Sequence, residues 1–185
     1  MTKQVTVPSI LNDELDVTQV LAYAGCVLLA FELVKSLIIK PIKAFYWNTT
    51  FCESSPFRSY KEDVLTRHRN EFEACLLYLR DFMEAISNEE FLSIQALRHH
   101  RNQLAHNLPD ILNTLDIGSC KPLLERTDRV LFTLSNYRVR MEIAADPEFA
   151  DRGIDWDTVV GSEYILFKEV LKKIRLLGYQ VESDP

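Results

Sequence analysis

The chain contains few helix breakers and no cysteine pattern that builds a metal site or a disulfide framework. Only five of its 185 residues are glycine, and long apolar, acidic and basic residues predominate, which favours helix over sheet. The four cysteines are widely spaced and include no Cys-x-x-Cys pair, so they suggest neither a zinc site nor disulfides. We therefore expect an all-α protein with free thiols in a reducing cytoplasm, and no metal or other cofactor.

An excess of positive charge is also lacking. The formal net charge of −6 argues against a protein that coats nucleic acid nonspecifically, although it leaves room for a local basic cleft. Residues 1–12 lack the basic start and the apolar run of a signal peptide. The apolar run 21–39 is interrupted by Glu32 and Lys35, whose charges would be costly inside a bilayer. We expect a cytoplasmic protein that does not span a membrane.

Helical periodicity is present over most of the chain and predicts one domain over 1–185. An Asp16-x-x-Gln19 capping box opens a first helix that should end near Pro41. Because this helix has little polar surface, it should be central to a bundle or part of a dimer interface. Residues 45–56 have no apolar period and predict a loop.

Two further capping boxes predict the second and third helices. Ser59-x-x-Glu62 opens the second, and Ser87-x-x-Glu90 opens a third that begins at Asn88 and ends at Pro109. His68 falls in the apolar row of the second helix, so we expect a core or interface histidine there rather than a catalytic one. Since only a tight break separates the two helices, they should form an antiparallel hairpin.

The last part of the chain predicts two more helices. Gly118 should lie in a loop, and Pro122 in the first turn of a fourth helix. Its apolar seam consists of Leu123, Thr127, Val130, Leu134, Tyr137 and Met141. The four helices, over about 14–144, predict an antiparallel, up-and-down four-helix bundle. An acidic connector and an additional C-terminal helix should follow over 145–178. The apolar face of that helix consists of Tyr164, Ile165, Phe167, Val170, Leu171, Ile174 and Leu177, with Gly178 as its C-cap.

One stretch, 98–109, concentrates ionisable side chains near the end of the third predicted helix. It includes three of the four histidines in the chain, which are His99, His100 and His106. At about 100° per residue, His99, Asn102 and His106 share one stripe of the helix, with Gln103 at its edge. This stripe is the strongest concentration of candidate functional groups in the sequence.

Arg101 falls instead among apolar neighbours, between Leu97 and Leu104. A charge in that position is costly unless it is paired or reaches an anion. In a purely structural interpretation, Arg101 pairs with Glu32 of the first helix, and the histidines form a solvated cluster near a helix C-terminus, where cations are favoured. The spacing alone leaves the structural and the functional interpretation open.

The segment Arg101-Asn102-Gln103-Leu104-Ala105-His106 resembles the R-x4-H signature of the HEPN superfamily, in which a polar residue often follows the arginine. Three further features extend the resemblance over roughly 16–144. They are the hydrophobic first helix with its Phe-Glu-Leu-Val-Lys segment (31–35), the helix hairpin, and the place of the signature near the end of the third helix. The connector and the C-terminal helix would then extend a HEPN-like bundle.

The resemblance implies a metal-independent endoribonuclease whose homodimer brings two signatures together in one cleft. Arg101 would bind the scissile phosphate, His106 would transfer protons, and Asn102 would orient the imidazole or bind a phosphate oxygen. Attack of an RNA 2′-hydroxyl on its own phosphate needs an acid, a base and charge stabilisation, but no metal. The surrounding side chains expected to bind RNA are Arg98, His99, His100 and Gln103.

Such a nuclease would be a toxin or an antiphage defence effector, controlled by an antitoxin or another regulatory protein. In one toxin branch, an antitoxin modifies a tyrosine two residues after the histidine, but this chain has Leu108 there. The alternative is a noncatalytic HEPN-like module that binds a nucleotide or a partner protein, with the C-terminal helix covering the cleft. A third interpretation is a helical subunit without a site, in which Arg101 is bonded to Glu32 and closed off from solvent.

Overall fold

The computed structural model describes residues 14–111, 115, 117–143, 146–150 and 152–179, which form helices and no strand. The helices are α1 (Glu14–Asn48), α2 (Glu71–Asp81), α3 (Asn88–Ile111), α4 (Ile117–Ile143), the short α5 (Pro147–Ala150) and α6 (Ser162–Tyr179). A π-helical turn (Tyr60–Val64) and a 3-10 turn (Leu65–Arg67) precede α2. The all-α prediction is confirmed.

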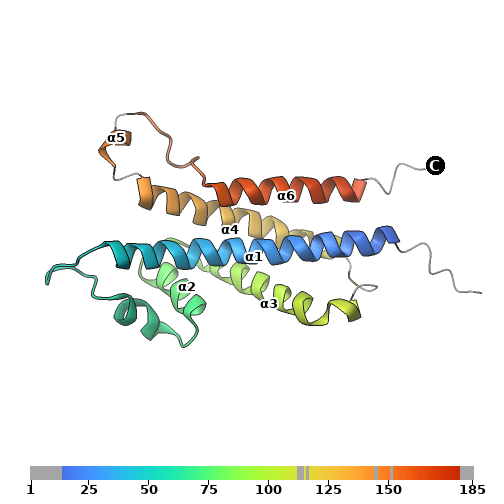
Figure 1. Cartoon of the computed structure of the whole chain (residues 1–185), viewed down its shortest axis with the longest axis horizontal. Coiled ribbons are helices and arrows are strands. Elements are labelled where there is room, and N and C mark those ends of the chain that lie inside the picture. The colour runs from blue at the N-terminus through green and yellow to red at the C-terminus, as the bar shows by residue number, and fades with distance from the viewer. Residues whose placement is uncertain (1–13, 112–114, 116, 144–145, 151, 180–185) are drawn as a thin grey trace, which may run out of the picture.

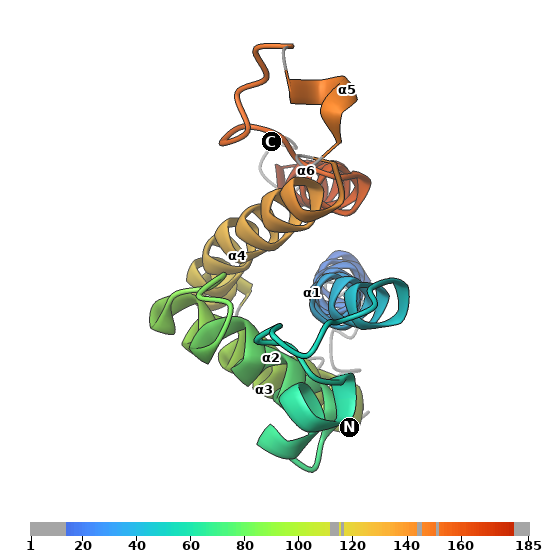
Figure 2. The ribbon, with the colours of Figure 1, turned by 90° about the vertical axis from the view of Figure 1, so that its left-hand side faces the viewer.

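The central helix of the bundle is α1. It contacts α2, α3, α4 and α6, and α6, α4, α1 and α3 lie one below another in Figure 1. The helices α3 and α4 also contact each other, whereas α6 lies across α1 and α4. The end-on view places α6 and α3 at opposite ends of this stack (Figure 2). A helical bundle with an added C-terminal helix is therefore present, as the sequence predicts.

Both predicted ends of the first helix are wrong. The helix α1 begins at Glu14, so Asp16 is not its cap, and it continues through Pro41 to Asn48. A proline inside a helix removes one backbone hydrogen bond. Ile42, directly after Pro41, is only 5% exposed, and burial of such a side chain contributes roughly 1.5–3 kcal/mol. Packing beyond the proline therefore offsets the lost bond.

The length and composition of α1 would also suit a membrane span. The most apolar 18-residue stretch within Val17–Asn48 has a mean hydropathy of 1.9, but 56% of that stretch is buried inside the protein. Tyr23, Val27, Ala30 and Val34 are fully buried. The apolar character of α1 is thus used largely for contacts with the other helices.

The second predicted helix is interrupted. Its capping box forms, because Ser59 Oγ accepts a hydrogen bond from the Glu62 backbone N–H at 3.2 Å and donates to the Glu62 carboxylate at 2.7 Å. The backbone then becomes extended at His68 and Asn70, and Asn70 caps α2 by accepting from the Glu73 N–H at 3.2 Å. His68 is exposed, so its predicted place in a buried row is wrong.

The expected hairpin of α2 and α3 is present. Glu73, in the first turn of α2, bonds to Gln95 and Arg98 in the middle of α3. The Ser87 capping box also forms, with the Glu90 N–H donating to Ser87 Oγ at 3.2 Å. The helix α3 is kinked at Asn107 (φ −121°, ψ 15°) and continues to Ile111. It therefore extends past Pro109, where the sequence predicts its end.

The C-terminal half differs from the prediction at helix ends. The helix α4 begins at Ile117, so Gly118 is helical and Pro122 lies beyond the first turn; both predictions are wrong. The proline removes only the bond to the Gly118 carbonyl. The predicted seam faces the core, with Thr127, Val130 and Leu134 buried.

The apolar face of α6 is narrower than predicted. Phe167 and Leu171 are buried, but Ile165 is 56% exposed, because it lies on the side of α6 that faces away from α1 and α4. The acidic connector contains the short α5. Gly178 lies inside α6, so it is not a C-cap. The side chains of Ile174, Leu177 and Cys120 lie outside the described residues, and Cys26, Cys52 and Cys75 are free.

Candidate functional site

A small polar hollow lies where α1, α2 and α3 meet, and we call it the Arg101 hollow. Its volume is about 230 Å³. It is lined by Phe31 and Lys35 of α1, by Asn70 and Phe72 at the start of α2, and by Arg98, Arg101 and Asn102 of α3. Three of these seven side chains are cationic, so the hollow is suited to an anion.

The Arg101 guanidinium is held from several sides. It lies over the Phe31 ring at 5.1 Å from the ring centroid. Nη2 donates to Glu32 Oε1 at 3.3 Å, and Nη1 donates to Asn102 Oδ1 at 3.1 Å. Nε is buried without a hydrogen-bond partner. The Nε–H donor of the fork is therefore unused in this arrangement.

The ion pair with Glu32 agrees only partly with the structural interpretation of Arg101. The pair is present, but 31% of the Arg101 side chain and 52% of the Glu32 side chain are exposed. Glu32 also contacts Lys35, at 3.7 Å, so two cations share one carboxylate. Exposed pairs of this kind contribute about 0–1 kcal/mol. Arg101 is therefore accessible to solvent and able to exchange Glu32 for another anion.

Arg98 forms a more strongly fixed wall of the hollow. It pairs with Glu73, whose side chain is 11% exposed, and its guanidinium lies over the Phe72 ring at 5.7 Å. Gln95 Nε2 donates to the other carboxylate oxygen of Glu73 at 2.6 Å. Because a buried carboxylate needs its partners, Arg98 contributes to the packing of α2 on α3 as well as to the charge of the hollow.

His106 does not line the Arg101 hollow. It is exposed on the last regular turn of α3, directly before the kink at Asn107. Five residues advance a helix by about 500°, so Arg101 and His106 project about 140° apart around α3. Asn102 lies between them, since it bonds to Arg101 and shares the stripe of His106. One chain therefore brings Arg101 and Asn102 together but not Arg101 and His106.

The remaining predicted site residues divide into two groups. His99 and Gln103 are exposed on α3. His100 is partly buried, and its Nε2 lies 2.8 Å from the Tyr23 hydroxyl of α1. Burial lowers the pKa of His100 below its ordinary value of 6.5. The unprotonated nitrogen of a neutral ring can accept a hydrogen bond from the tyrosine hydroxyl, so His100 belongs to the packing between α1 and α3.

No family model, curated protein or solved structure matches the chain. The resemblance to the HEPN superfamily therefore depends on the signature and on the helical arrangement around it. Among the described residues, no three His, Cys, Asp or Glu side chains gather as metal ligands.

Sequence reasoning missed the part of the Arg101 hollow that comes from α2. Asn70 and Phe72 enter it because α2 begins at Glu71, whereas the prediction made one longer helix. Asn70 followed by two acidic residues in the next three, Glu71 and Glu73, is the signal for a helix N-terminus. That signal would have placed the start of α2 correctly.

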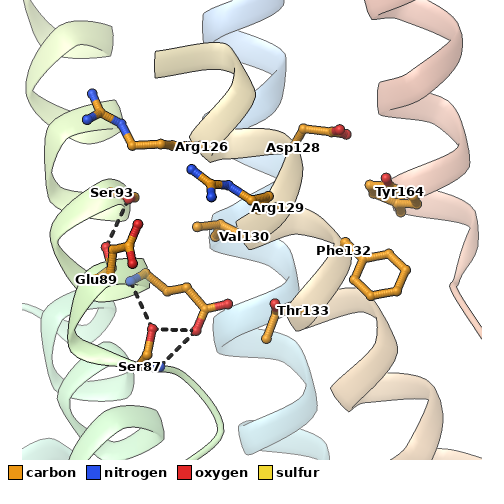
Figure 3. Close-up of a pocket in the computed structure, with 11 residues that line it drawn as sticks. Ser87, Glu89, Ser93, Arg126, Asp128, Arg129, Val130, Phe132, Thr133 and Tyr164 are labelled. Carbon is orange, nitrogen blue, oxygen red and sulfur yellow. Dashed lines mark hydrogen bonds between the residues drawn. The ribbon is translucent and has the colours of Figure 1, made fainter. Parts of the chain in front are cut away.

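Figure 3 shows a different hollow, of about 470 Å³, between the start of α3, α4 and the start of α6. Arg126 and Arg129 of α4 line it, but so do Glu89 and Glu90. Lys168 pairs with Asp128 there at 2.9 Å. Because opposite charges are mixed on its walls, this hollow points to no class of ligand.

Proposed function

We propose that the chain is a metal-independent HEPN-type endoribonuclease that acts in the cytoplasm as a homodimer, as a toxin or antiphage defence effector. The observation that carries the proposal is the accessible Arg101 guanidinium in a cationic hollow, five residues before an exposed histidine on the same helix. These are the two groups that phosphate binding and proton transfer require.

In the proposed reaction, Arg101 exchanges Glu32 for a phosphate oxygen of the RNA and stabilises the charge that develops on it. One His106 takes the proton of the 2′-hydroxyl, whose oxygen attacks the adjacent phosphorus. The second His106 of the dimer gives a proton to the leaving 5′-oxygen, so the products are a cyclic phosphate and a free hydroxyl. Asn102 positions Arg101 by accepting from Nη1.

Two observations support the dimer. The side chains of Arg101 and His106 project in different directions from α3, and one face of α1 is exposed. Leu21 is 48% exposed and Leu28 is 36% exposed, and a Cβ placed on Gly25 between them would contact nothing within 4 Å. These three residues lie on one stripe that continues to Glu32. The helices α1 and α3 run in opposite directions (Figure 1), so the stripe begins at the end of the bundle where α3 ends. A second copy on this stripe brings the two signatures close together.

The test is expression of the native chain beside Arg101→Ala, His106→Ala and His68→Ala, with growth arrest and cleavage of total RNA as readouts. His68 is the control, because it is an exposed histidine outside the signature and outside the residues expected to bind RNA. We expect loss of at least about 100-fold in cleavage for the first two variants and near-native cleavage for His68→Ala. Equal behaviour of all four proteins would refute the nuclease.

The second candidate is a noncatalytic module that binds a nucleotide or a partner protein. The contact between Arg101 and Glu32 favours it, because a carboxylate already occupies one edge of the guanidinium. This candidate also predicts that the C-terminal helix covers the cleft. However, α6 lies across α1 and α4, at the opposite end of the stack from α3 (Figure 2). RNA binding that depends on Arg101, without cleavage, would support this candidate.

A further inference from the structure

A larger hollow, which we call the aromatic hollow, lies where α1 ends. Its volume is about 800 Å³, within the range of pockets that hold small organic ligands. Four rings and two cations line it, which are Tyr46, Trp47, Phe51, Tyr60, Lys43 and Arg58. The combination of ring faces and positive charge is the one that proteins use to bind unpaired nucleotides.

The loop that closes the aromatic hollow is held in place by its own contacts. Phe51 packs on Phe45 with ring centroids 5.6 Å apart, and Phe57 packs on the same ring at 4.9 Å. The Tyr46 hydroxyl donates to Asp63 Oδ2 at 2.8 Å, and the backbone N–H of Arg58 donates to the same oxygen at 2.7 Å. The walls are therefore formed before a ligand arrives, which lowers the cost of ordering them.

Trp47 differs from the other rings because its surface is 89% exposed. An indole is a large apolar surface to leave in water at the end of a helix. It lies on the rim of the aromatic hollow, where a flat ligand can stack on it. Stacking of a base on an aromatic side chain contributes about 1–3 kcal/mol.

Arg58 supplies the free charge beside this ring. Lys43 is already paired with Glu71 at 2.8 Å, and the Tyr60 hydroxyl donates to the same carboxylate oxygen at 2.9 Å. The Arg58 side chain is exposed and forms no ion pair within the described part of the chain. Its guanidinium is therefore available to a phosphate next to a base stacked on Trp47.

The aromatic hollow and the Arg101 hollow both take part of their walls from α1. Lys35 lines the Arg101 hollow and Lys43 lines the aromatic hollow, and their separation of eight positions corresponds to about 12 Å along helix α1. Asn70 of the first hollow directly precedes Glu71, which bonds to Lys43. A short single strand that lies along α1 and α2 can contact both hollows.

We propose that the aromatic hollow binds an unpaired base of the RNA strand whose phosphate lies in the Arg101 hollow, with the base on Trp47 and its phosphate at Arg58. This inference rests on the proposed function, because it takes RNA as the ligand of the Arg101 hollow. It adds that the RNA is single-stranded there, since the bases of a duplex are stacked on one another and cannot stack on a side chain.

The experiment uses the full chain with two background substitutions. His106→Ala prevents cleavage, and Trp156→Phe removes one of the two tryptophans in the sequence, so that only Trp47 fluoresces as a tryptophan. The probe is a fluorescently labelled single-stranded oligoadenylate, followed by anisotropy, with quenching of Trp47 as a second readout. In this background we compare Trp47→Leu, Trp47→Phe, Arg58→Ala and the control Leu92→Ala, whose side chain is 58% exposed on α3.

We expect Trp47→Leu to weaken binding about 5- to 150-fold, while Trp47→Phe, which keeps a ring, retains most of the affinity. Arg58→Ala should weaken binding and reduce its salt dependence, and Leu92→Ala should bind normally. Unchanged binding by Trp47→Leu would overturn the inference. The nuclease proposal would survive that result if Arg101→Ala abolished binding. Equal binding of duplex RNA, or equal quenching by adenosine monophosphate at the same nucleotide concentration, would also overturn it. Binding that depends on Trp47 without RNA cleavage by the native chain would support it and count against the nuclease.

Discussion

Arg101 of α3 and Glu32 of α1 are joined by an Nη2–Oε1 contact of 3.3 Å, although both side chains remain open to solvent. The carboxylate lies where a phosphate oxygen would lie if Arg101 bound RNA. Lys35 contacts the other oxygen of Glu32 at 3.7 Å. Glu32 therefore holds two cations of the Arg101 hollow near each other and competes with an anionic ligand for both.

Removal of this competing carboxylate should strengthen RNA binding. In the His106→Ala background, we expect Glu32→Gln to lower the Kd for single-stranded RNA about five-fold, because one unit charge at about 4 Å in water is worth about 1 kcal/mol. The effect should shrink at high salt, since exposed charges are screened. Anisotropy titrations at two salt concentrations measure it, with Glu89→Gln, another exposed acid, as the control. An unchanged or raised Kd for Glu32→Gln would contradict the competition.

A second prediction concerns the carboxylate that fixes Arg98. Glu73 is 11% exposed and bonds to both Arg98 and Gln95, so Glu73→Ala leaves two polar side chains without their acceptor. We expect it to lower the free energy of unfolding by roughly 1–3 kcal/mol, as measured by urea denaturation. Glu71→Ala is the matched control, because Glu71 lies in the same turn of α2 but is 42% exposed. A smaller loss for Glu73→Ala than for Glu71→Ala would show that the bonds to Glu73 contribute little.

The positions of the long helices could be predicted from sequence because apolar residues recur there at helical spacing. The buried rows of α1 and α4 follow this spacing closely, and the capping boxes at Ser59 and Ser87 form as expected. Helix ends were less predictable. Pro41 and Pro122 lie inside helices, because tertiary packing beyond a proline outweighs the local loss of one bond.

The candidate site could be predicted only in part. Arg101 and Asn102 are bonded neighbours in the Arg101 hollow, and the alternative partner Glu32 could be anticipated from the apolar surroundings of Arg101. The contribution of Asn70 and Phe72 does not follow from an unbroken helix that begins at Ser59, because a helix break changes which side chains a helix presents. The contact between His100 and Tyr23 joins residues 77 apart in sequence, and no local pattern indicates such a pairing.

A third prediction tests the dimer through the exposed stripe of α1. Leu21→Lys should prevent association, because it places a charge in the centre of an apolar contact, and it should leave the monomer folded, because Leu21 is 48% exposed. Leu166→Lys on α6 is the matched control, since Leu166 is also 48% exposed. Sedimentation of the native chain and the two variants measures the association. We expect dimers for the native chain and Leu166→Lys, and a monomer without RNA cleavage for Leu21→Lys. A dimeric, active Leu21→Lys variant would rule out this stripe as the interface.

The last prediction concerns the effect of pH on the contact between His100 and Tyr23. Burial lowers the pKa of His100 in the folded protein below its ordinary value of 6.5, so the unfolded chain takes up the proton first as the pH falls. The stabilising contribution of the neutral ring is complete above about pH 6.5 and is lost as the pH falls from there toward the lower pKa of the folded state. We expect the free energy of unfolding of the native chain to fall more steeply between about pH 7 and pH 5 than that of His100→Gln, which does not titrate. Urea denaturation over this range measures both slopes. Equal slopes for the native chain and His100→Gln would mean that protonation of His100 does not oppose folding. The contact between neutral His100 and Tyr23 would then not contribute to the packing of α3 on α1.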